Sequence, residues 1–154
     1  MSKFLDKYIA REAIDIVQPT IEKFLGSSHT GKENDSIHIV VLNPGTEDIL
    51  FEESLGADKS TWNYPYDEIA RSKARICQRT GMVGRDVQVH APWHYESGDT
   101  RYVGGVYENG LVVAASGIQD HYDEMFAWMV VSAIQGLCRD SVSLMSDNAP
   151  NFFG

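Results

Sequence analysis

The sequence predicts an α+β domain in which helices pack on an antiparallel sheet. Two β-hairpin patterns and three amphipathic helical patterns carry this prediction, and they alternate along the chain as helix, hairpin, helix, hairpin, helix. Strands that follow one another through short turns pair antiparallel, and the intervening helices cover the apolar faces of the sheet. The length of 154 residues fits a single domain over 1–154, because two domains would each have little core.

Three segments have the apolar spacing of a helix with one buried face. The first is an N-terminal helix within residues 1–26, in which Pro19 predicts a kink or a break. The second covers about 64–80 and the third about 120–139. Residues 140–154 are mostly polar and are predicted to form a C-terminal tail.

Apolar runs on either side of turn residues predict the strands. They form two hairpins, 37–42 with 49–51 and 102–108 with 111–115. The second is the clearer one, because Asn109-Gly110 suits a type I′ turn, which needs two positive φ angles. Residues 85–89 could add a short edge strand, so we expect a sheet of about five strands.

Composition excludes several classes of protein. The net charge is −9, from 13 Lys and Arg against 22 Asp and Glu, which argues against binding to nucleic acids or to anionic membranes. No apolar run approaches the roughly 18–20 residues of a membrane helix. The N-terminus lacks the apolar stretch of a signal peptide, so we expect a cytoplasmic protein. Cys77 and Cys138 are predicted to be small buried residues rather than a disulfide or metal ligands.

Three blocks within residues 3–138 occur together in one order. They are Ile39–Gly45 with Glu53–Ala57, then Ile69–Ala74, then Gly104–Gly117 followed by Asp123-Glu124. Together they resemble the HbpS/GlcG-like family, also called haem-degrading-like, which includes the C-terminal domain of PduO-type proteins. The sequence departs from the family at Asn43, where the family has Asp, and over 89–100, which is unlike the family.

The resemblance implies a profilin-like sandwich, with an antiparallel sheet of about five strands and helices packed on it. It also implies a homo-oligomer and a small-molecule partner, because family members bind haem or corrinoid-like tetrapyrroles. Other members occur in the catabolism of small acids or aromatic compounds. The fold carries over from this resemblance more directly than any activity.

The irregular segment 82–101 is the first candidate site. It contains His90, Trp93, His94, Tyr95 and Glu96. Imidazole binds haem iron and divalent metals, and the two aromatic side chains could stack on a flat ligand. The alternative is a surface or oligomer-contact loop with incidental histidines.

A metal site would form if this segment folded over the start of the last helix. His90, His94 and His121 would then be the ligands of a divalent metal or a haem iron. Asp120, Asp123 and Glu124 occupy the same helix start, where capping of the helix is the simpler interpretation.

Two further candidates lie outside that segment. Lys73 falls on the apolar stripe of its helix and could bind a carboxylate or a haem propionate. The alternative is an aliphatic stem on the core with the amine in solvent. Ser116 and Gly117 form a turn into a helix, whose free N–H groups could hold an acidic ligand.

Three functions remain compatible with these residues. The first is a small-ligand-binding protein for haem, another tetrapyrrole or a metal. The second is a catabolic enzyme, an isomerase, lyase or decarboxylase, using His90, His94 and His121 with Glu96 or Asp99, with or without a divalent metal. The third is a scaffold for assembly alone.

Overall fold

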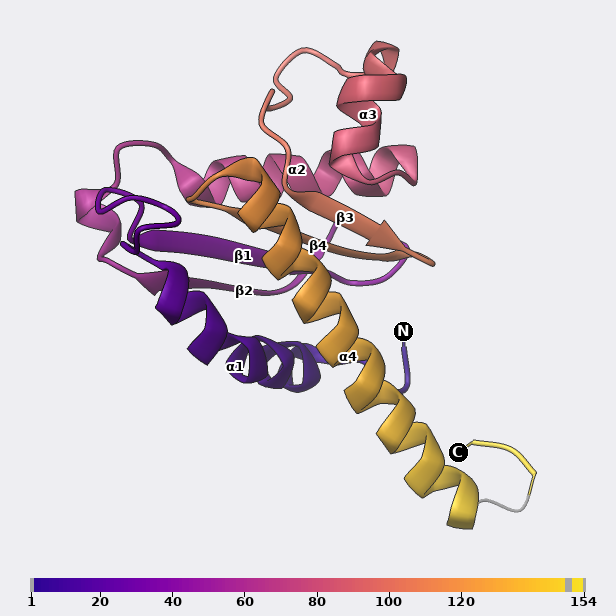
Figure 1. Cartoon of the computed structure of the whole chain (residues 1–154). Coiled ribbons are helices and arrows are strands. Elements are labelled where there is room, and N and C mark those ends of the chain that lie inside the picture. Colours follow the sequence, from indigo (N-terminus) through magenta and orange to yellow (C-terminus); the bar gives the residue numbers. More distant parts are fainter. Residues whose placement is uncertain (1, 149–150, 154) are drawn as a thin grey trace.

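Helices pack on an antiparallel sheet, as the sequence predicted, and they cover both of its faces. The computed structural model describes residues 2–148 and 151–153, and in this part of the chain the sheet has four strands in the order β2-β1-β4-β3 (Figure 1). The strands are β1 (Ser36–Leu42), β2 (Ile49–Gly56), β3 (Gly105–Glu108) and β4 (Leu111–Ser116). Every neighbouring pair is antiparallel.

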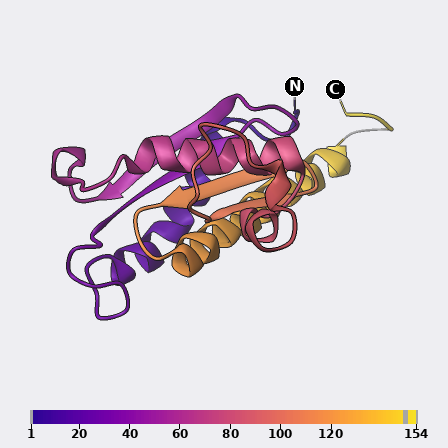
Figure 2. The same cartoon turned by 90° about the horizontal axis from the view of Figure 1, so that it is seen from above.

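The helices form a layer on each face of the sheet. α1 (Lys7–Phe24) and α4 (Asp120–Asn148) pack together on one face, and α2 (Tyr66–Thr80) covers the other. The view from above in Figure 2 shows α2 in front of the strands, with α1 and α4 behind them. The short helix α3 (Gly84–His90) lies beside α2.

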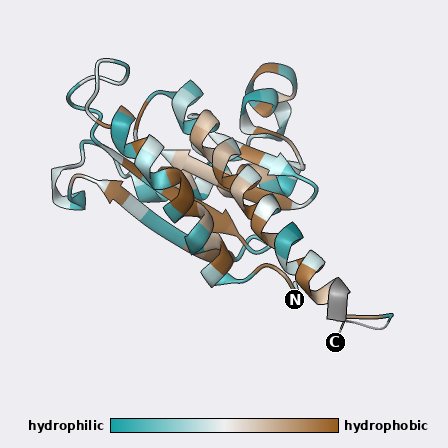
Figure 3. Ribbon diagram, turned by 60° about the horizontal axis from the view of Figure 1, so that its bottom comes forward, coloured by the Kyte–Doolittle hydropathy of each residue, from teal (hydrophilic) through white to brown (hydrophobic). Residues whose placement is uncertain are grey.

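The two faces of the sheet have different cores. Ile37, Ile39 and Val41 of β1 face α1 and α4, and pack in the larger core with Phe126. The alternate residues of β1 face α2, where the smaller core includes Ala70, Ala74 and Cys77 of that helix. These short side chains let α2 approach the sheet closely. Figure 3 shows hydrophobic and hydrophilic residues alternating around the long helices, as expected when one face of each is buried.

Local turn chemistry confirms the second hairpin. Asn109 and Gly110 between β3 and β4 have φ angles of 50° and 90°, both positive as a type I′ turn requires. Gly81 ends α2 in the left-handed conformation, with its N–H donating to the Cys77 carbonyl. Cys77 and Cys138 are free thiols; Cys77 is buried as predicted, whereas Cys138 is only half-buried.

Two predictions about elements were wrong. Residues 85–89 form part of the helix α3 rather than an edge strand, which leaves four strands in the described chain instead of about five. Val87 is buried while Val89 is 62% exposed, so this segment has no buried strand face.

The last helix does not end near 139 but continues to Asn148, so most of the predicted tail is helical; residues 149–150 and 154 lie outside the described residues. No described helix is both long and apolar enough to cross a membrane.

Pro19 lies inside α1, which continues through it without a break. Pro19 is exposed, and its ring removes one backbone hydrogen bond of the helix. Pro19→Ala should therefore raise the free energy of unfolding by about 1–2 kcal/mol, because the gain in helix propensity exceeds the entropy that Ala adds to the unfolded chain. Urea unfolding of the two proteins measures the difference, and an unchanged or lower value in the variant contradicts it.

Candidate functional site

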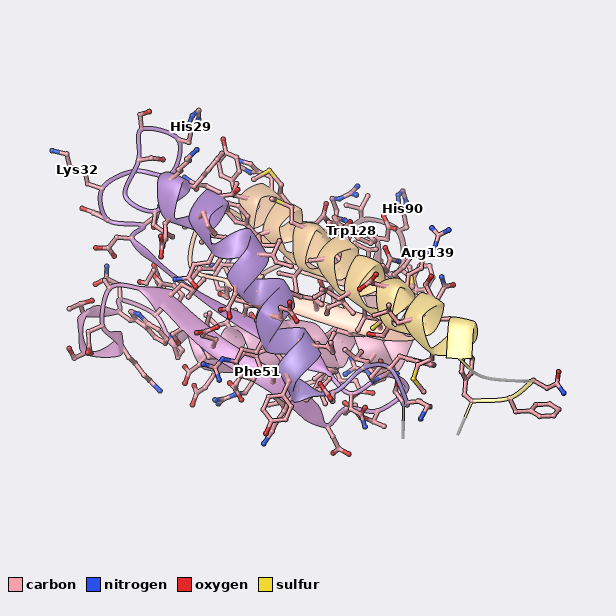
Figure 4. The ribbon with its side chains drawn as sticks, turned by 90° about the horizontal axis from the view of Figure 1, so that it is seen from below. His29, Lys32, Phe51, His90, Trp128 and Arg139 are labelled. Carbon is pink, nitrogen blue, oxygen red and sulfur yellow. The ribbon has the colours of Figure 1, made fainter. Side chains whose placement is uncertain are left out.

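The histidines of the predicted metal site are exposed and come from different elements. His90 ends α3, His94 lies in a short 3-10 helix after it, and His121 lies in the first turn of α4. Figure 4 shows His90 and His29 well apart, and the His29 ring is 6.4 Å from the ring of Tyr122, the neighbour of His121. His90 therefore lies away from the start of α4, although Arg85 of the same segment donates to Glu124 there at 3.0 Å.

Within residues 2–148 and 151–153, no three His, Cys, Asp or Glu side chains are grouped so that they could hold a metal ion. The structure thus does not bring His90, His94 and His121 together as ligands of one metal. Trp93 is 76% exposed, and the neighbouring Tyr95 is half-buried.

The irregular segment is held against α2 by Arg79. Its guanidinium lies 2.6 Å from Asp99 Oδ2 and 3.6 Å from Glu96 Oε1, and it donates to the His94 carbonyl oxygen at 3.0 Å. Asp99 in turn accepts the backbone N–H of Glu96 at 2.8 Å. Glu96 and Asp99 are therefore bound to an arginine rather than to an imidazole.

Lys73 on α2 forms a buried ion pair with Asp123 on α4. Lys73 Nζ lies 3.2 Å from Asp123 Oδ2, and the two side chains are only 2% and 3% exposed. The ammonium also donates to the Ala115 carbonyl oxygen at the end of β4, at 2.8 Å. The prediction that Lys73 lies on the buried face is confirmed, and its amine is buried with its stem rather than in solvent.

The Asp123 carboxylate both caps the start of α4 and pairs with Lys73. Its Oδ1 accepts the backbone N–H of Ile118 at 3.2 Å, which is the helix-start capping expected from the sequence, and its Oδ2 faces Lys73. Burial raises the pKa of Asp123 to about 7, and the nearby Lys73 ammonium only partly offsets this. Burial likewise lowers the pKa of Lys73.

Two glycines at the start of β3 make room for the ion pair and for α2. A Cβ atom on Gly104 would lie 2.8 Å from Lys73 Nζ and 2.9 Å from Asp123 Cβ, and one on Gly105 would lie 2.7 Å from Cys77 Sγ. Gly104 therefore lets the backbone pass directly over the ion pair, and Gly105 lets it approach α2.

A cavity of about 200 Å³ opens beside the ion pair, which forms part of its wall. Ser116 and Gly117, both predicted site residues, line it at the end of β4. None of residues 90–99 lines it. The other lining groups are three tyrosines, three aliphatic side chains and two polar side chains: Tyr64, Tyr66, Tyr102, Ile69, Val103, Ile118, Asn34 and Asp120.

Stability should depend on the pH through Asp123. Its folded pKa of about 7 lies above the ordinary 3.8, so the folded protein keeps a proton that the unfolded chain releases. The retained proton stabilises the folded state. This contribution to the free energy of unfolding is fully present below pH 4 and is lost as the pH rises to about 7, by at most about 1.4 kcal/mol per pH unit. Glu52, Asp67 and Asp99 have lowered pKa values, whose contributions are instead lost as the pH falls below about 4.

The measurement for this prediction is the free energy of unfolding of the wild type and of Asp123→Asn between pH 4 and 7. The wild-type value minus the variant value should fall steadily as the pH rises, because the carboxylates outside the pair contribute equally to both. A constant difference between the two proteins would show that Asp123 does not titrate in this range.

Comparison with known proteins shows a likeness at the level of the fold. No known family's sequence model matches the chain, and no curated protein matches it. Among solved structures, the chain is similar to the crystal structure of Klebsiella pneumoniae protein ORFY, a DUF336 protein. The TM-score is 0.60 and the sequence identity 12%, covering 85% of this chain and 90% of that chain. DUF336 is the GlcG-like family, so the shared fold agrees with the resemblance seen in the sequence.

Proposed function

We propose that the protein binds a small, uncharged polar molecule in the cavity beside Lys73 and Asp123. The observation that carries this proposal is a buried, hydrogen-bonded ion pair in the wall of a cavity. Charges at such depth are costly unless they are paired, and perturbed charged groups gather at binding and catalytic sites. A ligand in the cavity would meet both charged groups at once.

The size of the cavity supports a small ligand. Pockets for drug-sized molecules measure roughly 300–1,000 Å³, and this cavity measures about 200 Å³. A tetrapyrrole is itself larger than the smallest of these pockets and therefore does not fit a cavity of this volume. The size of the cavity thus does not favour haem. Haem binding at the exposed His90–His94 segment stays a separate prediction, which titration with haemin would test.

The charges around the cavity support an uncharged ligand. The ammonium of Lys73 is already neutralised by Asp123, and Asp120 adds a further carboxylate at the lining. No lining cation is therefore left to balance an acidic ligand. Tyrosine rings and hydroxyls, Ser116 and Asn34 instead offer surfaces and hydrogen bonds to a ligand with hydroxyl, carbonyl or amide groups.

The test is a set of small fragments in which each carboxylate is paired with its primary amide, screened by saturation-transfer NMR. The amides should bind and the carboxylates should not. Ile69→Trp, which fills the cavity from α2 without removing the ion pair, should abolish the signal. Arg79→Ala, outside the cavity, should leave it unchanged. Binding that survives Ile69→Trp would show that the ligand lies elsewhere.

A second candidate function is acid–base catalysis in the same cavity. With a pKa raised to about 7, Asp123 has both protonation states available near neutral pH, as a general acid or base requires. Lys73 Nζ at 3.2 Å would stabilise the charge that develops on a carbonyl oxygen beside it. This arrangement supports an enzyme that moves a proton next to a carbonyl group, with Asp123 in the role first expected of the histidines.

Exchange of carbon-bound hydrogen for deuterium tests this candidate. Small ketones and amides are incubated with the protein in deuterium oxide and followed by NMR. Exchange should occur with the wild type and be lost in Asp123→Asn. Asp120→Asn, which removes the neighbouring carboxylate only, is the matched control and should retain it. Exchange that persists in Asp123→Asn would exclude this role for Asp123.

A further inference from the structure

We propose that Ser54, His38 and Glu52 form a nucleophile–base–carboxylate triad that accepts an acyl group from an activated ester. The three side chains lie on the α2-facing side of β1 and β2, outside the set of residues that lines the cavity described above. A serine within hydrogen-bond reach of a histidine, itself oriented by a carboxylate, is the arrangement that activates a serine hydroxyl as a nucleophile.

The strand register places these side chains together. His38 of β1 is directly opposite Ser54 of β2, so both side chains lie on one face of the sheet, and Glu52 follows on the same face two residues away. His38 Nδ1 lies 2.6 Å from Ser54 Oγ, and His38 Nε2 lies 2.7 Å from Glu52 Oε1. One imidazole therefore connects the hydroxyl to the carboxylate.

The surroundings of His38 suit a base. The residue is only 5% exposed, and burial lowers the pKa of its imidazole more than the hydrogen bond to Glu52 raises it. The ring is thus neutral at neutral pH. With the Nε2 hydrogen donated to Glu52, Nδ1 carries the lone pair that accepts the Ser54 hydroxyl hydrogen.

Glu52 is fixed by a second partner. The Arg71 guanidinium donates from Nε at 2.9 Å, and a terminal nitrogen lies 2.8 Å away, both to the same Oε1 that meets His38. The Trp62 ring lies with its centroid 6.3 Å from that of the imidazole. The base and its carboxylate are therefore held in place, while Ser54 is exposed on β2.

The position on β2 gives a substrate access to Ser54. β2 is an edge strand of the described sheet, so backbone N–H groups on its outer side have no partner strand and can donate to a developing oxyanion. A shallow depression lined by Lys59, Trp62 and Tyr64 adjoins the network through Trp62 and offers aromatic surface for the acyl or leaving group.

The reaction is ester hydrolysis in two steps. Ser54 Oγ bonds to the ester carbonyl carbon while its hydrogen passes to His38 Nδ1, and Glu52 stabilises the imidazolium. The imidazolium then gives that proton to the leaving oxygen as the ester C–O bond breaks. In the second step water adds to the acyl-serine with His38 as base, which releases the carboxylic acid and restores the Ser54 hydroxyl.

The experiment uses p-nitrophenyl acetate with the full chain, following p-nitrophenolate release and locating the acetyl group by peptide mass spectrometry. The wild type should show a burst and an acetyl group on Ser54. Ser54→Ala should lose both, and His38→Gln should slow acetylation by at least about 100-fold. Ser60→Ala removes an exposed hydroxyl from the neighbouring 3-10 helix, outside the triad, and should match the wild type.

Three outcomes would overturn the proposal. They are a wild type that is not acetylated, acetylation confined to lysines, and a Ser54→Ala variant that keeps the wild-type burst. Because Ser54→Ala changes an exposed side chain, its fold is expected to persist, and circular dichroism checks this. The ligand-binding proposal for the cavity does not depend on any of these results.

Discussion

Lys73→Met is expected to lower the free energy of unfolding by about 1–3 kcal/mol, because the buried Asp123 carboxyl loses its partner and is left short of hydrogen bonds. The Asp123 side chain is 3% exposed, and the backbone N–H groups of Ile118 and Gly117 remain as its donors. Ala115 also loses the donor to its carbonyl oxygen. Urea unfolding at pH 7 measures the change.

The matched variant replaces both charges. Lys73→Met with Asp123→Leu should be less destabilised than Lys73→Met alone, because no unpaired charge is left in the core. Arg85→Met breaks a more exposed pair, with Glu124 at 3.0 Å, and should change stability much less than Lys73→Met does. The two losses of unfolding free energy, measured for the single variants, are added for comparison. A double variant that loses at least this sum would contradict the view that the two charges stabilise each other.

Gly117→Ala is expected to cost about 3 kcal/mol or more, the sum of backbone strain and overpacking. Gly117 has a φ angle of +152°, and a Cβ atom there would overlap the Ser36 carbonyl oxygen and lie 2.7 Å from Ile37 Cα. Both contacts are backbone atoms of β1, which cannot move without disturbing the sheet beside the cavity.

Gly98→Ala separates the two causes of that cost. Gly98 also has a positive φ angle, +93°, but no atom lies within 4 Å of the Cβ position. This variant should lose only about 1–2 kcal/mol, from the left-handed backbone alone. If Gly117→Ala were no more destabilised than Gly98→Ala, the close approach of β1 to the turn at Gly117 would be refuted.

Local patterns predicted most of the fold, and long-range contacts explain the failures. Asn109-Gly110 fixes its hairpin through neighbouring residues alone. The segment around Val87 and Val89 matches a strand by alternation, but it forms a helix against α2 and β3, so close that a Cβ atom on Gly84 would lie 3.4 Å from the Gly105 carbonyl oxygen. That contact depends on the path of the whole chain.

The sequence indicated some of the residues that line the cavity but not the contact between Lys73 and Asp123. Lys73 was singled out because a lysine on an apolar stripe needs a partner, and Ser116 and Gly117 because a turn into a helix leaves free N–H groups. Asp123 was interpreted as a helix cap, which it is, but its contact with Lys73 joins residues 50 positions apart. No spacing rule predicts such a contact before the sheet order is known.

The His38 network was missed for a similar reason. His38 alternates within a buried strand and gave no signal of a ligand or a base. Its partners, Ser54 and Glu52, lie on a strand predicted to be shorter than it is, and the pairing His38↔Ser54 depends on the register of the hairpin. A histidine on the buried side of one hairpin strand and a serine on the other were the only available clues.

The most direct test of the central claim is a crystal structure of the wild-type protein soaked with the tightest-binding amide fragment. The claim predicts density for the fragment inside the cavity, with an oxygen or nitrogen within hydrogen-bond distance of Lys73 Nζ or an Asp123 carboxylate oxygen. If the fragment were bound only at another place, and the cavity between α2 and the start of α4 held no fragment density, the claim would be contradicted.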